Sequence, residues 1–329
     1  MQRSRKLRLR ALWFQVHKWI GLLLAVLIVP ISLTGSALVW HDWLETLNPA
    51  RAVSGEPVLP HSAYTAAAER VLGPGERVMS IRFAEGEGPV LISAARPPEP
   101  GASRPIRTNI WLDPAEGRLL DRAASNEGAV RVLHVLHGSL MVSGVGRQIV
   151  GWVGVFMFVS SLTGLWLWWP VTGSVRRGIR WRRQNATSAN LHHQAGFWIL
   201  IPLAMLSFTG AWISFPGFFG PLSGEAPRGG PDRAMARRAQ PLERTTLGVN
   251  AAVAAAERHA TGRLLSIVWP TDQAPEWKIG FAREGGAAEV QVNDASAKVT
   301  PPGPPRPETL ARTMRRWHDG TGMARSGRW

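Results

Sequence analysis

Histidine is the residue type whose placement in this sequence is most suggestive of chemistry. Six of the nine histidines flank three long apolar runs, and a seventh lies near the end of the sequence. Imidazole can ligate a metal ion or a haem iron, although a histidine at a helix end can also simply lie among lipid headgroups. The seven are His17, His41, His134, His137, His192, His193 and His318. The other two, His61 and His259, are interpreted as surface residues.

Two of these histidines share a spacing. His17 is followed four residues later by Gly21, and His192 is followed four residues later by Gly196. Residues four apart lie on one helix face, so each glycine leaves room for a flat macrocycle beside an imidazole, or else allows close helix packing. Two imidazoles at one depth can be the axial pair of one haem. We therefore predict His17 and His192 as a ligand pair, with His193 competing for the second position.

A second group lies toward the other end of the apolar runs. His134 and His137 are three residues apart and share a face if their segment is helical. His137 precedes Gly146 by nine residues, as His318 precedes Gly327. A zinc site formed by His134, His137 and a carboxylate is the alternative interpretation.

Several other residues have two possible roles. Threonine–glycine pairs begin at Thr34, Thr163 and Thr209, and we interpret them as helix-packing positions, with contact to a haem edge as the alternative. Basic residues near the histidines could pair with haem propionates or with lipid headgroups. These are Lys18, Arg131 and Arg147.

Three apolar runs must position these side chains. They are Ile20–Trp40, Ile149–Pro170 and about Phe197–Phe215. About 20 helical residues cross a bilayer core of about 30 Å, so the runs predict an integral membrane protein with three visible transmembrane helices. The first run is too long for a cleaved signal peptide.

Charge and composition narrow the function further. Arginines cluster before the first run and between the second and third, which predicts that both clusters are cytoplasmic and that the long segments 41–146 and 217–329 face outside. The formal charge of +15 is therefore attributed to membrane topology and not to nucleic-acid binding. The sequence contains no cysteine, so disulfides, thiolate iron–sulfur sites and covalent haem attachment are excluded, and any haem must be bound non-covalently.

The chain contains an internal repeat. The His–Gly and Thr–Gly spacings of the first span recur in the third, and each span is followed by a soluble segment containing the sequence AAAER, then Ser–Ile, alternating strand-like residues and a turn. Each soluble segment is therefore predicted to be a small α+β domain. By this repeat a fourth helix would follow residue 329, and we expect it to be missing through loss or truncation.

These patterns divide the chain into nine segments. They are a basic cytoplasmic N-terminus (1–10), a first transmembrane helix (11–43), a first α+β domain (55–125), a His-bearing segment with a second helix (131–170), a basic cytoplasmic loop (171–190), a third helix (191–216), a linker (217–247), a second α+β domain (248–305) and a His-bearing segment (306–329).

The sequence resembles the PepSY-associated transmembrane proteins, which include iron-regulated inner-membrane proteins and ferric-siderophore reductases. The resemblance rests on the runs HKWIGLLLAVLIVPISLTGSALVWHDWL, LHGSLMVSGVGRQIVGWVG and LHHQAGFWILIPLAMLSFTGAWISFP and covers nearly the whole chain. It implies PepSY-like extracytoplasmic domains and a four-helix unit that holds b-type haem through histidines, with His137 and His318 as a periplasmic pair beside His134. It further implies electron transfer across the bacterial cytoplasmic membrane to a periplasmic iron complex such as a ferric siderophore.

The sequence has no dinucleotide-binding signature, because Gly144-x-Gly146 lacks a third glycine at the required spacing. Electrons are therefore expected from a partner, either membrane quinol or a separate flavoprotein. Two alternatives remain: a membrane-anchored PepSY binding or regulatory protein without enzymatic activity, and an inactive truncated copy.

Overall fold

The computed structural model describes most of the chain, in two compact units. The described residues are 2–40, 48–84, 86–97, 107–169, 179–180, 185–223, 238–283, 286–304 and 308–320. Residues 1–39, 132–228 and 308–329 belong to the first unit, called here the membrane unit, and residues 40–131 and 229–307 to the second, called the sheet unit. His41, most of the expected basic loop and the Gly327–Arg328 repeat lie outside the described residues.

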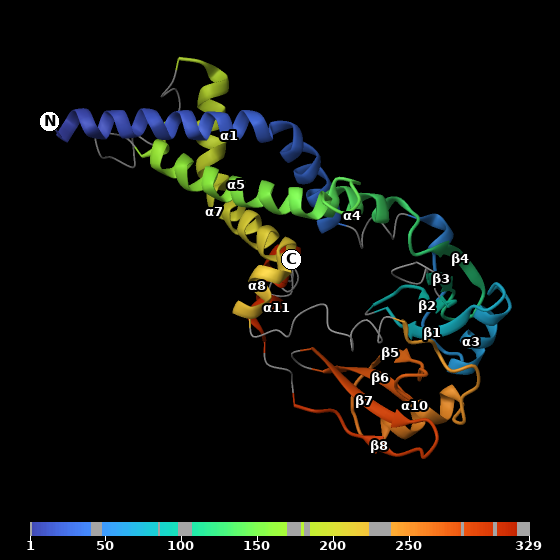
Figure 1. Ribbon diagram of the computed structural model, residues 1–329. Coiled ribbons are helices and arrows are strands. Elements are labelled where there is room, and N and C mark those ends of the chain that lie inside the picture. The colour runs from blue at the N-terminus through green and yellow to red at the C-terminus, as the bar shows by residue number, and fades with distance from the viewer. Residues whose placement is uncertain are drawn as a thin grey trace. The chain divides into compact units, whose positions relative to one another are not determined.

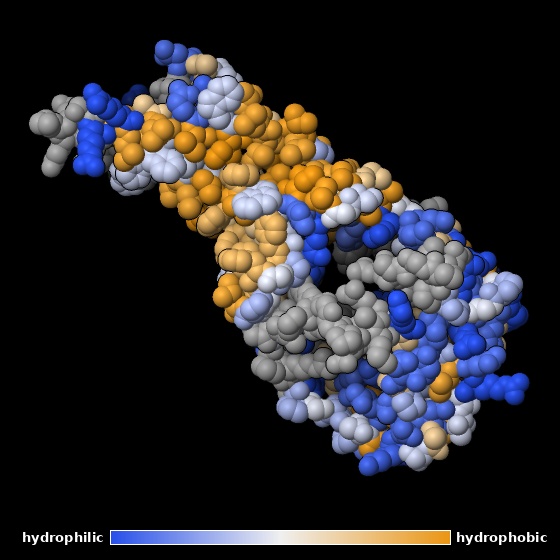
Figure 2. Space-filling model, in the orientation of Figure 1, coloured by the Kyte–Doolittle hydropathy of each residue, from blue (hydrophilic) through white to orange (hydrophobic). Residues whose placement is uncertain are grey.

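The membrane unit contains three long apolar helices, as the hydrophobic runs predict. These are α1 (Gln2–Val39), α5 (Gly146–Trp168) and α7 (Thr187–Ser214). Each contains a stretch long and apolar enough to cross a membrane. Helix α5 packs against both α1 and α7 (Figure 1), and Figure 2 shows hydrophobic residues along most of the visible face of this unit, with hydrophilic residues at its N-terminal end. Burial in lipid explains the outward-facing apolar side chains, since the bilayer takes the place of a protein core.

The first and third helices begin earlier than the sequence predicts. The basic segment before the first span forms the first turns of α1, which begins at Gln2. The third helix begins at Thr187, four residues before the expected Leu191. The segment before the first span continues the helix because its lysine and arginines favour the helical state nearly as strongly as alanine does.

Three shorter helices complete the membrane unit: α4 (Ala129–Ser139), α8 (Pro216–Leu222) and α11 (Leu310–Asp319). Helix α11 follows Thr309, whose hydroxyl accepts a hydrogen bond from Arg312 N, and it ends at Gly320 in the left-handed conformation. It packs against α7, and its Ala311 and Met314 are buried.

The sheet unit is one eight-stranded antiparallel sheet with the strand order β4-β3-β2-β1-β5-β6-β7-β8. The first soluble segment supplies η1 (Pro49–Arg51), α3 (His61–Glu69), β1 (Arg77–Arg82), β2 (Val90–Ala95), β3 (Arg107–Leu112) and β4 (Leu119–Ala124). The second supplies α10 (Val249–Glu257), β5 (Leu264–Val268), β6 (Glu276–Arg283), β7 (Gly286–Asn293) and β8 (Val299–Thr300). Each segment is thus a helix followed by four strands, and the two are joined in one sheet.

The join is made by equivalent residues of the two repeats. Strands β1 and β5 pair antiparallel with Ile81 opposite Ile267, and both side chains are fully buried. Helices α3 and α10 contact each other, and Ser62 and Asn250, the second residues of these helices, exchange two hydrogen bonds. One hydrophobic core runs under both helices, so the two soluble segments fold as a single body.

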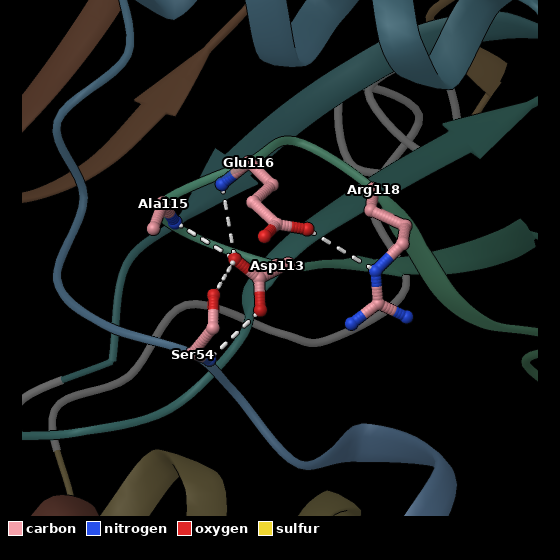
Figure 3. Close-up of polar contacts among 5 residues, drawn as sticks. All are labelled: Ser54, Asp113, Ala115, Glu116 and Arg118. Atoms are coloured by element: carbon pink, nitrogen blue, oxygen red, sulfur yellow. Dashed lines mark hydrogen bonds and ion pairs between the residues drawn. The ribbon is translucent and has the colours of Figure 1, made fainter.

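Each repeat carries a buried aspartate at the turn predicted from the sequence. Asp113 accepts hydrogen bonds from Ser54 N and Oγ, both at 2.8 Å, and from the backbone nitrogens of Ala115 and Glu116 (Figure 3). Burial alone would raise the pKa of Asp113, but these hydrogen bonds outweigh it and lower the pKa below its ordinary value. The equivalent Asp294 accepts from Trp277 Nε1 at 2.9 Å and from two backbone nitrogens.

Candidate functional site

Two pairs of histidines meet inside the membrane unit. The rings of His17 on α1 and His192 on α7 have centroids 6.1 Å apart, with an interplanar angle of 60°. Imidazole nitrogens bind metals at about 2.0 Å, and each ring centre lies about 1.1 Å behind its nitrogen, so two rings ligating one iron from opposite sides have centroids about 6.2 Å apart. The observed separation therefore suits an axial pair.

The second pair brings together one histidine from the segment before α5 and one from the segment after the last strand of the sheet unit. His137 on α4 and His318 on α11 have ring centroids 5.9 Å apart, tilted by 41°. Burial lowers the pKa of His318, and the neighbouring His137 lowers it further. Both effects favour the neutral imidazole, which is the form that ligates metals.

A cavity of about 850 Å³ surrounds the first pair, within the size range of cofactor sites. Gly21 and Gly196 line it, and a Cβ built on either glycine would have no atom within 4 Å. These glycines thus face open space and not a neighbouring helix. This favours a role in leaving room for a macrocycle over a role in close helix packing. The three histidines His17, His192 and His193 also line the cavity.

Each Thr–Gly pair contacts one of the paired histidines, a role that the packing interpretation missed. His17 Nδ1 lies 3.1 Å from both Ser160 O and Thr163 Oγ1. A Cβ on Gly164 would lie only 3.1 Å from His17 Cε1, so the glycine is needed for the imidazole to reach the helix backbone. We call such a site, a Thr–Gly pair with the carbonyl three residues before the threonine, a Thr–Gly notch.

The other two notches hold the second histidine pair. His137 Nδ1 lies 2.9 Å from Ile31 O, the carbonyl three residues before Thr34. His318 Nδ1 lies 3.1 Å from Thr209 Oγ1 and also forms a backbone hydrogen bond with Leu206. Cβ atoms built on the following glycines, Gly35 and Gly210, would lie 2.8 and 3.1 Å from the Cε1 atoms of the same two histidines. The fixed positions of these glycines after threonine, repeated three times, were the signal for this contact.

The two remaining candidate histidines lie apart from the pairs. His193 is next to His192 in sequence, but its ring stacks on Trp168 with centroids 6.2 Å apart. His134 is exposed on α4. Within the described residues there is no group of three histidine, cysteine, aspartate or glutamate side chains that could hold a metal ion, so the zinc alternative for His134 and His137 has no third ligand there.

Among the described residues that line the cavity, Arg10 carries a cationic side chain, and from the sequence it was expected only as part of the basic N-terminal segment. Its guanidinium donates to Trp166 O at 3.2 Å and to Leu167 O at 2.5 Å, and the residue lines the cavity beside His17. A cation at the last carbonyls of a helix also interacts favourably with the helix dipole. Lys18 instead lies over the Trp19 ring, 5.0 Å from its centroid.

The turn between α4 and α5 fixes the position of His137. The backbone is left-handed at Leu140, Met141 and Gly144, a conformation that costs free energy in residues other than glycine. A Cβ on Gly146 would lie 2.0 Å from Ser139 O. The glycine nine residues after His137 is therefore explained by the close approach of α5 to the end of α4.

Comparison with known proteins identifies the family. A search of curated proteins gives no match. The family model described as the PepSY-associated TM region matches residues 14–329, nearly the full chain and both histidine pairs. The chain is therefore a membrane protein of the PepSY-associated TM family.

Proposed function

We propose that this protein is a b-type haem electron-transfer protein, with one haem at each histidine pair. His17 and His192 would ligate the first haem, and His137 and His318 the second. The observation that carries the proposal is the meeting of two histidine pairs, each at the separation of an axial pair. When bound, the haem would supply one-electron transfer.

The residues around the first pair suit a haem in four respects. The cavity has room for a macrocycle at Gly21 and Gly196. Its wall is largely apolar, which suits the body of the cofactor. Arg10 supplies a cation at the edge of the cavity that can pair with a propionate. The Nδ1 of His17 faces a backbone carbonyl, the usual partner of a metal-ligating imidazole.

The two pairs lie at different depths along the spans. His17 is on α1, and the notch for His137 is on the same helix, around Thr34. Seventeen residues of helix correspond to about 25 Å, so the two haems would stand on opposite sides of the membrane. By the positive-inside rule, we infer that the N-terminus and the His17–His192 pair face the cytoplasm of a bacterial inner membrane, with the sheet unit in the periplasm.

We infer that the acceptor is a periplasmic iron complex, such as a ferric siderophore. One electron leaves a quinol or a reduced flavoprotein on the donor side, and Fe(III) in the outer complex becomes Fe(II). The chain's own residues would hold the cofactor, exclude water from it and set its potential, and the acceptor would bind outside the membrane.

The test is a haem titration of the full chain purified in detergent from cells well supplied with haem. We expect reduced-minus-oxidised spectra with b-type bands and about two haems per chain, as the two pairs require. Replacing His17 or His192 by Ala is expected to remove one haem, and replacing His137 or His318 the other. The matched controls are His193→Ala and His134→Ala, each a near neighbour that belongs to neither pair.

Iron reduction needs its own measurement. The dithionite-reduced chain, freed of reductant, should be reoxidised by a ferric hydroxamate complex with one Fe(II) trapped per electron. The Ga(III) complex, which is similar in size and charge and is not reducible, should leave the reduced bands unchanged. Absence of haem from every preparation would instead favour a membrane-anchored binding protein.

A further inference from the structure

We propose that the three Thr–Gly notches are positioning elements, each of which holds one paired histidine as the tautomer protonated on Nδ1 and leaves Nε2 free to ligate. This inference rests on the proposed haem function for its purpose, but its geometry can be tested without haem. The three notches and their histidines are Thr163–Gly164 with His17, Thr34–Gly35 with His137, and Thr209–Gly210 with His318.

The carbonyl in each notch determines where the ring proton lies. Ser160 O and Ile31 O can only accept a hydrogen bond, so the Nδ1 atoms of His17 and His137 donate to them. Ser160 Oγ, 3.3 Å from His17 Nδ1, then serves as a further acceptor for the same proton. A neutral imidazole carries one proton, and Nε2 therefore keeps its lone pair.

The threonine hydroxyls are already committed as donors. Thr163 donates to Ser160 O at 3.0 Å, and Thr209 donates to Met205 O at 2.8 Å. A hydroxyl has a single proton, so each oxygen is left as an acceptor toward the Nδ1 atom of its histidine, 3.1 Å away. In these two notches the threonine thus reinforces the tautomer that the carbonyl selects.

The glycine decides how closely the ring can approach. The atoms around a Cβ built on Gly164 and on Gly210 are the Cε1, Nδ1 and Nε2 of the respective histidine, at 3.1, 3.7 and 4.0 Å in both cases. Any larger side chain would push the ring off its acceptors. The same arrangement therefore occurs on α5 and on α7, for histidines of different pairs.

His192 provides the internal comparison. In the part of the chain that the structure describes, its ring contacts His17 and forms no hydrogen bond. The first pair therefore joins one histidine held by a notch to one that no described residue holds. An imidazole that donates from Nδ1 is more basic at Nε2, so the notch should favour the ferric state and lower the midpoint potential.

The first experiment uses the full chain, labelled with ¹⁵N-histidine and incorporated without haem into lipid nanodiscs. We expect His17 to give the signals of a single tautomer protonated on Nδ1 and His192 to give exchanging tautomers. Gly164→Val should remove the single tautomer of His17. Gly196→Val is the matched control, because it faces the cavity and should leave the His17 signals unchanged while blocking haem. A His17 ring protonated on Nε2, or unaffected by Gly164→Val, would overturn the proposal.

The second experiment measures midpoint potentials of the haem-loaded chain. Thr163→Val should raise the potential of the haem at His17–His192 and leave that of the other haem unchanged. Thr209→Val should raise the potential of the haem at His137–His318 and leave that of the first haem unchanged. Thr163→Ser should restore the wild-type potential, because serine keeps the acceptor oxygen. Potentials that do not change in either valine variant would count against the proposal. If no haem binds at all, the proposed function fails, and the NMR result alone decides whether the notches act as described.

Discussion

His318 Nδ1 lies 3.1 Å from Thr209 Oγ1, the same distance that separates His17 Nδ1 from Thr163 Oγ1. The two contacts connect different pairs of helices, α11 with α7 and α1 with α5. Because an imidazole needs a fixed ring plane to ligate a metal reproducibly, we infer from the repetition that the spans position the histidines through the hydroxyls and carbonyls of their Thr–Gly notches. Substitutions that move the backbone or a helix end should therefore affect the site at a distance.

The turn between α4 and α5 gives the first such prediction. Gly146→Ala places a methyl group against Ser139 O, so α4 must shift and His137 must leave its notch. We expect loss of the haem at His137–His318 and retention of the haem at His17–His192, measured as haem per chain. Gly138→Ala on α4, with no atom near its Cβ position, should keep both haems. Equal loss of both haems in Gly146→Ala would mean that the whole unit had been disturbed.

The join between the repeats gives a prediction about stability. Ile81→Ala or Ile267→Ala creates a cavity in a fully buried site and should cost about 2–5 kcal/mol. Because the two residues face each other, the cost of the double substitution should differ from the sum of the two single costs. We expect this coupling energy to be about 0.5–3 kcal/mol. Hydrogen–deuterium exchange of β1 and β5 in the full chain measures this as the free energy of local opening. Val58→Ala, at a side chain that is 72% exposed, is the control, and strictly additive costs would contradict the pairing.

The lowered pKa of Asp113 predicts a dependence of stability on pH. The folded-state pKa lies below the unfolded value of about 3.9, so the stabilisation is fully present above that value and is lost as the pH falls through the folded pKa. Asp113→Asn should cost about 1–3 kcal/mol at neutral pH, because an amide nitrogen then faces the Ser54 donors. The substitution should also make the free energy of unfolding depend less on pH at acid pH. Exchange protection of β3 and β4, corrected for the intrinsic effect of pH, provides the measurement. If the wild-type protein and the Asp113→Asn variant lose stability equally as the pH falls, Asp113 is not the cause of that loss.

The three spanning helices, the repeat and the pairing of His17 with His192 could all be anticipated from the sequence. Each depends on spacing along one chain, and spacing is visible without a structure. Identical His–Gly and Thr–Gly intervals in the first and third spans were enough to place two imidazoles at one depth. The order helix, strands and turn in each soluble segment was visible for the same reason.

The partners of individual atoms could not be anticipated. His192 and His193 are adjacent, and only the rotation of α7 assigns one to His17 and the other to Trp168. The role of Arg10 depends on where the last carbonyls of α5 lie. The joining of two soluble segments into one sheet depends on which strand edges are left open, and a pattern within one segment does not specify this.

Equivalent positions of the two repeats meet three times: Ile81 with Ile267, His17 with His192, and His137 with His318. Such self-matching contacts are those of a symmetric dimer, here built into one chain. Neither repeat contains a complete histidine pair, because each pair takes one residue from each. Covalent linkage replaces an encounter between two molecules in the membrane with one within a single molecule. Assembly of both histidine pairs is therefore independent of the concentration of the protein in the membrane. Every chain also carries the two repeats in a one-to-one ratio.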